Sequence, residues 1–150
     1  DVQAAVLSYG GYNLYSPALK GIFETRKNPF WTLALSKPRG IFGNNFNAQE
    51  NPEMYKAISP IYNIPNIDER KLPPQFITSA SEDRVTPVHA IEEYVKALKD
   101  AGQEVTYWEY KDQRHAYLDS GKTFLSGNDF KRDAIPALKK IMNFLNSKLL

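Results

Sequence analysis

The stretch from Lys71 to Tyr117 most constrains the fold, because two strand patterns flank a helix pattern within it. An apolar run at 75–80 leads into a polar turn that carries Asp83. A second run at 104–110, rich in β-branched and aromatic residues, leads into another polar turn that carries His115. The segment between them is long enough to connect two parallel strands. The stretch therefore predicts a βαβ unit with an acid and a histidine at equivalent strand ends.

The helix within this unit has a start, an apolar stripe and a stop. Thr86 is expected to cap it, with Pro87 in its first turn, and Gly102 is expected to end it in a left-handed conformation. His89, on its polar side, is interpreted as a solvated helix residue. The stripe that should face the sheet consists of Val88, Ile91, Val95 and Leu98.

Asp83 and His115 are the candidate site residues. Ligands of open α/β sheets bind beyond the carboxyl ends of the strands, where these two side chains can meet. An Asp that accepts from the imidazole Nδ1–H fixes the tautomer and leaves Nε2 as a base. The alternative is that both are ordinary polar turn residues, which is the better interpretation for either one alone. Their order and placement as a pair favour a functional role.

At this point the chain resembles the α/β-hydrolases, above all esterases and lipases of the hormone-sensitive-lipase and acetylesterase type, with the prolyl-oligopeptidase group second. The resemblance covers nearly the whole chain outside residues 12–50. It departs from the family pattern at Ala80, where members usually have Gly, and at Gln113 and Arg114, where a Gly usually precedes the histidine. The segments that carry it are 2–11, 55–60, Pro73-Pro74, 81–87, 97–102 and His115.

The resemblance also implies that a large part of the fold lies outside this sequence. The family triad runs Ser, Asp, His, with the serine on a Gly-x-Ser-x-Gly elbow. Residues 1–150 contain no such pentapeptide and no His-Gly-Gly oxyanion segment. The expected fold class is therefore α/β: the C-terminal half of one α/β-hydrolase domain, with parallel strands and flanking helices. The N-terminal half would carry the nucleophile and would be a partner of this chain.

The resemblance bears on two further parts of the chain, residues 12–50 and Ser8. Residues 12–50, rich in aromatic residues, resemble a cap insertion over the active site, although they could equally pack two short helices onto the domain. Ser8 is in the right chain order to be the nucleophile. Gly10 suits an elbow but Val6 does not, so a serine at a strand end is the favoured interpretation of Ser8.

The resemblance implies acyl transfer through a covalent serine ester, with His115 as acid and base and Asp83 orienting it. Three functions stay open. The first is a carboxylesterase or lipase acting on small or lipid-like esters, the second is a serine peptidase of the prolyl-oligopeptidase type, and the third is a noncatalytic binding module with a hydrolase-like fold. The esterase leads on the likeness of residues 12–50 to an esterase cap.

Composition excludes several other classes. The net charge is +2 and the basic residues are scattered, which argues against a nucleic-acid partner. No apolar run is long enough for a membrane span. With no cysteine and only two histidines, the chain offers no thiolate or histidine-cluster metal site, and no cofactor is expected.

Helices are also predicted at both sides of the βαβ unit. Asn51 is expected to cap a short helix that reaches Ile58, with Pro52 at its first position. A C-terminal helix should begin near Asp133, because Pro136 fits only in a first turn. The apolar stripe expected to pack this helix onto the domain consists of Ile135, Leu138, Met142, Leu145 and Leu149.

Overall fold

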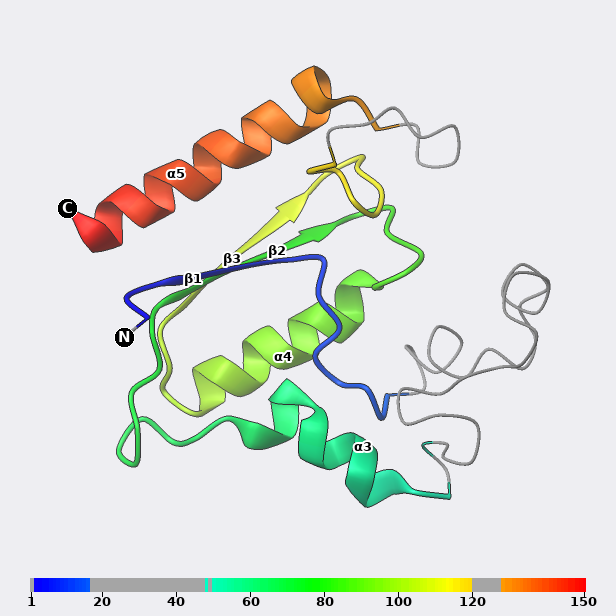
Figure 1. The fold of residues 1–150 in the computed structure, drawn as a ribbon, viewed down its shortest axis with the longest axis vertical. Helices are drawn as coiled ribbons and strands as arrows, with labels where there is room; N and C mark the ends of the chain where they lie inside the picture. Colours follow the sequence, from blue (N-terminus) through cyan, green and yellow to red (C-terminus); the bar gives the residue numbers. More distant parts are fainter. Residues whose placement is uncertain (1, 17–47, 49, 120–127) are drawn as a thin grey trace.

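The computed structural model describes residues 2–16, 48, 50–119 and 128–150, and it has an α/β architecture (Figure 1). Three parallel strands form one sheet in the order β1-β2-β3. The predicted cap at 12–50 lies mostly outside the described residues. Among the described residues, the strands are β1 (Ala5–Ser8), β2 (Gln75–Ala80) and β3 (Val105–Tyr110), and the helices are α3 (Pro52–Ile58), α4 (Val88–Asp100) and α5 (Ile135–Leu149).

The central strand β2 is buried along its whole length. It pairs in parallel with β1, from Ala5 opposite Gln75, and with β3, up to Ala80 opposite Tyr110. The sheet separates α4 and α3 on one face from α5 on the other (Figure 1). Covering both faces explains why every residue of β2 is buried, the polar Gln75, Thr78 and Ser79 included. The strand boundaries at 75–80 and 105–110 confirm the βαβ prediction.

Helix α4 packs on the sheet largely as its stripe predicted. Ile91, Val95 and Leu98 are buried in a core cluster with Ile77 of β2. Its connection to β3 turns at Gly102, which has φ 73°. A Cβ at Gly102 would also meet Ile67 Cγ2 at 2.8 Å, so both conformation and space favour glycine. The left-handed end predicted for this helix is therefore confirmed.

The start of α4 differs from the prediction. Pro87 occupies the N-cap position, and no side chain hydrogen-bonds the first turn. The Thr86 hydroxyl instead contacts Asp83 and the Tyr9 carbonyl. The cap prediction was wrong: the helix begins one residue later than predicted, and the Thr86 side chain is directed at the buried Asp83 carboxylate 2.8 Å away. Asn51 is at the N-cap of α3 as predicted, but its side chain makes no capping hydrogen bond either.

Helix α5 also packs differently from the prediction. A π-helical turn, Phe130–Ala134, precedes it, and Ala137 and Phe144 are its buried residues. Phe144 stacks on Phe76 of β2, with ring centroids 5.3 Å apart. In the predicted stripe, Ile135, Leu138, Met142 and Leu149 are 36% to 59% exposed. The prediction failed because periodicity shows which flank of a helix is apolar, and not which flank meets the sheet.

Candidate active site

The turns that follow β2 and β3 are tied together at the carboxyl end of the sheet. Ser81 N–H donates to the Tyr110 carbonyl at 3.0 Å, which extends the ladder by one residue. Beyond it, Glu82 N–H donates to the Gln113 carbonyl at 2.8 Å, and Asp112 N–H donates to Ser81 Oγ at 2.8 Å. These bonds fix the separation of the two turns, and with it the positions of the acid and the base.

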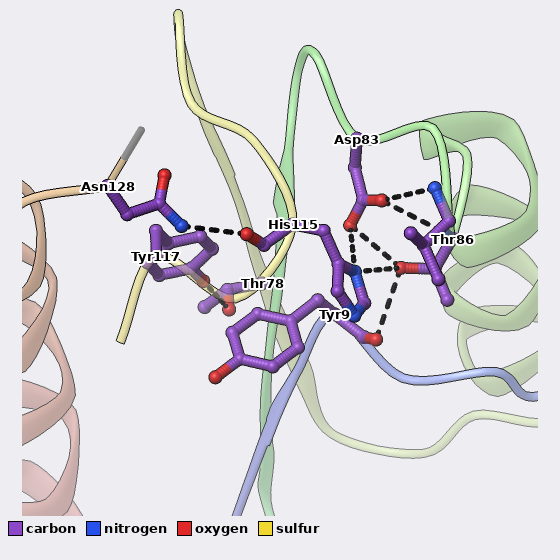
Figure 2. Close-up of polar contacts among 8 residues, drawn as sticks. Tyr9, Thr78, Asp83, Thr86, His115, Tyr117 and Asn128 are labelled. Carbon is purple, nitrogen blue, oxygen red and sulfur yellow. Dashed lines mark hydrogen bonds and ion pairs between the residues drawn. The ribbon is translucent and has the colours of Figure 1, made fainter. Parts of the chain in front are cut away.

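Asp83 and His115 meet in the space between these turns (Figure 2). Asp83 Oδ2 lies 2.8 Å from His115 Nδ1, and the two residues come from positions 32 apart in the sequence. The Asp83 side chain is fully buried, whereas that of His115 is 33% exposed. A buried carboxylate that binds Nδ1 stabilises the Nδ1–H tautomer, so the imidazole presents its Nε2 lone pair as a base.

Asp83 is held in the ionised state by the bonds it accepts. Oδ1 accepts from the backbone N–H groups of Val85 at 2.7 Å and Thr86 at 2.8 Å, and Oδ2 accepts from the Thr86 hydroxyl at 2.8 Å. Burial is the largest single influence and raises the pKa of Asp83. The bonds from His115, Thr86 and Val85 together outweigh it, and the pKa lies below its usual value. The carboxylate therefore stays charged beside the imidazole at neutral pH.

Thr86 connects this pair to the end of β1. Its single hydroxyl proton faces two acceptors, Asp83 Oδ2 at 2.8 Å and the Tyr9 carbonyl at 3.1 Å. Its oxygen also lies 3.5 Å from His115 Nδ1. Sequence reasoning missed this role. The spacing of Asp and Thr, three residues apart after a strand, is typical of a local side-chain-to-backbone motif and could have suggested the contact.

The turn around His115 has left-handed residues at positions that differ from the family pattern. Asp112 has φ 57° and Ala116 has φ 62°, whereas the glycine of the family pattern was expected at 113 or 114. The His115 carbonyl accepts from Asn128 Nδ2 at 2.8 Å. Asn128 is buried and precedes the turn that leads into α5. Nothing in the sequence marked this residue, because the contact spans two loops.

Ser8, the alternative nucleophile, is the last residue of β1. Its hydroxyl is buried and lies close to the Tyr117 hydroxyl, where it helps to hold down a Tyr117 pKa that burial raises. Tyr117 is also hydrogen-bonded to Thr78 of β2. Ser8 is therefore part of a buried cluster of hydroxyl groups with Thr78 and Tyr117. His89 lies on the exposed side of α4, as predicted.

Within the described ranges, no three His, Cys, Asp or Glu side chains come together as metal ligands. None of the helices described has the length and apolar character that crossing a membrane requires.

The chain matches the model of a protein family and is similar to several solved structures. The model of the prolyl oligopeptidase family matches residues 31–149. The acylaminoacyl peptidase of Pyrococcus horikoshii superposes with a TM-score of 0.64 at 21% identity, over 98% of this chain and 20% of that one. A puromycin-hydrolyzing peptidase of Mycobacterium tuberculosis gives 0.63 at 18% identity, over 98% and 19%.

An esterase is among the similar structures as well. Est2 of Thermogutta terrifontis gives a TM-score of 0.57 at 19% identity, over 99% of this chain and 43% of that one. None of the curated protein sequences gives a significant match. These likenesses show that the described residues have an α/β-hydrolase fold. The chain spans about a fifth of the length of the two peptidases and under half of the esterase.

Proposed function

The chain belongs to the prolyl oligopeptidase family, and on that premise we propose that it supplies the acid and the base of a serine hydrolase. The observation that carries the proposal is the 2.8 Å contact between a fully buried Asp83 carboxylate and a partly exposed His115 imidazole, at adjacent strand ends. His115 Nε2 takes the proton of a serine hydroxyl as it attacks the substrate carbonyl. Asp83 balances the positive charge that then develops on the imidazole.

The later steps use the same pair. The protonated His115 gives its proton to the leaving group, and an acyl-enzyme remains on the serine. His115 then takes a proton from water, which attacks the acyl-enzyme and releases the acid product. Asp83 keeps its charge throughout, because its hydrogen bonds hold its pKa low. The serine and the oxyanion donors come from the N-terminal half of the same hydrolase domain.

Two unpartnered features support an interaction with that N-terminal half. Among the described residues, the outer edge of β1 has no neighbouring strand, which leaves its backbone groups open to pairing. The second feature is the apolar stripe of α5, in which Leu138 is 36% and Met142 59% exposed. The stripe is separate from the groove between β3 and α5. Lys140, Asn143 and Ser147 line that groove, and they lie on the flank of α5 opposite Leu138 and Met142.

Peptides and esters are both candidate substrates. The family match and the two peptidases favour an amide substrate, whereas the likeness to Est2 favours an ester. Measuring kcat/KM for an N-acyl-amino-acid anilide and for a p-nitrophenyl ester, in the protein that contains this chain with its nucleophile, decides between them. Anilide hydrolysis favours the peptidase, and ester hydrolysis without it favours the esterase. If His115→Ala keeps both the anilide and the ester hydrolysis rates, the proposed function is wrong.

The third function, a noncatalytic binding module, is distinguished by the same experiment. It predicts no turnover of either substrate by the protein that contains this chain. The isolated 150-residue chain is expected to be a poor catalyst in any case, because it lacks the nucleophile and the oxyanion donors. A measurable rate from the chain alone that His115→Ala abolishes would contradict this account of how the site is divided.

A further inference from the structure

Tyr9 has a backbone conformation that large side chains rarely adopt. It follows the last residue of β1 and has φ 41°, in the left-handed region. The next residue, Gly10, could adopt a positive φ freely, but the left-handed position is occupied by Tyr9. A left-handed bulky residue persists only where its surroundings determine it. Its contacts therefore indicate what the conformation achieves.

Three contacts hold Tyr9 in place. Its N–H donates to the Thr78 carbonyl at 3.0 Å, which keeps the residue attached to β2. Its carbonyl accepts from the Thr86 hydroxyl at 3.1 Å. Its ring lies edge-on to Tyr117, with centroids 5.2 Å apart. The left-handed turn is what allows the residue to stay in the ladder while its carbonyl reaches Thr86.

The Tyr9 ring also lies against the imidazole of His115, with centroids 5.1 Å apart and planes at 61° (Figure 2). Edge-to-face contacts of this kind are attractive and have a preferred direction. The imidazole thus has Asp83 on its Nδ1 and an aromatic wall beside its ring. The hydrogen bond fixes one atom of the imidazole, and the wall limits rotation of the ring about that bond.

We propose that Tyr9 is a positioning residue for His115, acting through its ring, with its carbonyl held by Thr86. This inference rests on the proposed function for what His115 does once it is positioned. The phenol hydroxyl has no part in it, because the contact with His115 is made by the ring. The residue acts on the base alone and does not need to touch the substrate.

The test compares two substitutions that keep the same backbone strain. Tyr9→Phe retains the ring, and Tyr9→Leu removes it, while neither side chain is β-branched. Tyr62→Leu, at a position that is 49% exposed, is a matched control for the loss of a tyrosine. The readout is the ¹H–¹⁵N signal of His115 Nδ1–H in the protein that contains this chain with its N-terminal half, with Tm measured on every variant.

Wild type, Tyr9→Phe and Tyr62→Leu should show a downfield Nδ1–H signal that exchanges slowly with water. In Tyr9→Leu the signal should broaden or vanish while Tm shows that the chain is still folded. If Tyr9→Leu lowers Tm and leaves the signal unchanged, Tyr9 only packs the core and the proposal is wrong. It is also wrong if Tyr9→Phe loses the signal, since the hydroxyl would then be the active group.

Turnover separates this inference from the proposed function. In the protein with its nucleophile, Tyr9→Leu should lower kcat about tenfold or more with KM little changed, because misplacement of the base affects the chemical step. A changed Nδ1–H signal in a protein without hydrolase activity would leave the positioning role standing and contradict the proposed function. An unchanged kcat in an active protein would contradict the positioning role alone.

Discussion

The hydroxyl of Thr86 lies 2.8 Å from Asp83 Oδ2, on the same oxygen that binds His115. The carboxylate oxygen that faces the base is thus shared by two donors. The other oxygen is satisfied by two backbone N–H groups, so every bond to Asp83 favours its ionised form. The Asp83 carboxylate is therefore stabilised by residues of its own turn, Val85 and Thr86, independently of its hydrogen bond with His115.

Removing the Thr86 hydroxyl should weaken this arrangement. Thr86→Val keeps the shape and deletes the donor, so the pKa of Asp83 should rise toward its usual value. The loss of a buried hydrogen bond to a charged group should cost about 1.5–3 kcal/mol. Titration of the Asp83 ¹³Cγ signal and urea unfolding measure the two effects. Thr86→Ser, which keeps the hydroxyl, should resemble the wild type, and equal behaviour of Val and Ser variants would contradict the assignment.

The stability of the chain should fall in acid partly through Asp83. The pKa of Asp83 in the folded state is below its usual value, so Asp83 binds protons more readily when unfolded. Its contribution is fully present above the unfolded pKa and is lost as the pH falls through the folded pKa. Asp133 and Glu104 have lowered pKa values as well, so the wild type must be compared with Asp83→Asn. The stability difference should shrink below about pH 3.9; a constant difference would show that Asp83 has no linked proton.

Gly102 should not tolerate a side chain. Gly102→Ala meets both a left-handed φ of 73° and the Ile67 side chain at 2.8 Å. It should lower the free energy of unfolding by about 1–2 kcal/mol from the backbone conformation alone, and by more from the contact. In an Ile67→Ala background the 2.8 Å contact is removed and only the Cβ of residue 67 remains, at 3.4 Å, while the φ strain stays, so the Gly102→Ala substitution should cost less there. Equal costs in both backgrounds would show that the contact has no effect.

The two flanks of α5 should differ in their contribution to stability. Phe144 is 8% exposed and stacks on Phe76, so Phe144→Ala should destabilise the 150-residue chain by about 3–5 kcal/mol. Met142 is 59% exposed, so Met142→Ala should change stability by no more than about 0.5 kcal/mol. Chemical unfolding of both variants tests this. A larger loss of stability in Met142→Ala than in Phe144→Ala would mean that the predicted apolar stripe packs on the domain, and would contradict the packing described here.

The parts of the fold that follow from local pattern were predictable from the sequence. The bounds of β2 and β3, the left-handed Gly102 and the nearness of Asp83 to His115 follow from periodicity, turn chemistry and the meeting of parallel strand ends. The flank of α5 that meets the sheet was not predictable, because α5 is apolar on more than one flank. Tyr9 and Asn128 were missed because their partners lie in other loops or strands, and no spacing rule records such contacts. Thr86 was missed although its spacing from Asp83 was a usable signal.

The central claim is that Asp83 and His115 activate a serine that these 150 residues do not contain. Labelling of the natively prepared protein with a fluorophosphonate, followed by intact-mass analysis and peptide mapping, tests it most directly. The account predicts an adduct on a serine upstream of this chain, lost in His115→Ala and on heat denaturation. An adduct on Ser8, with the same sensitivities, would contradict it and would mean that the chain carries its own nucleophile.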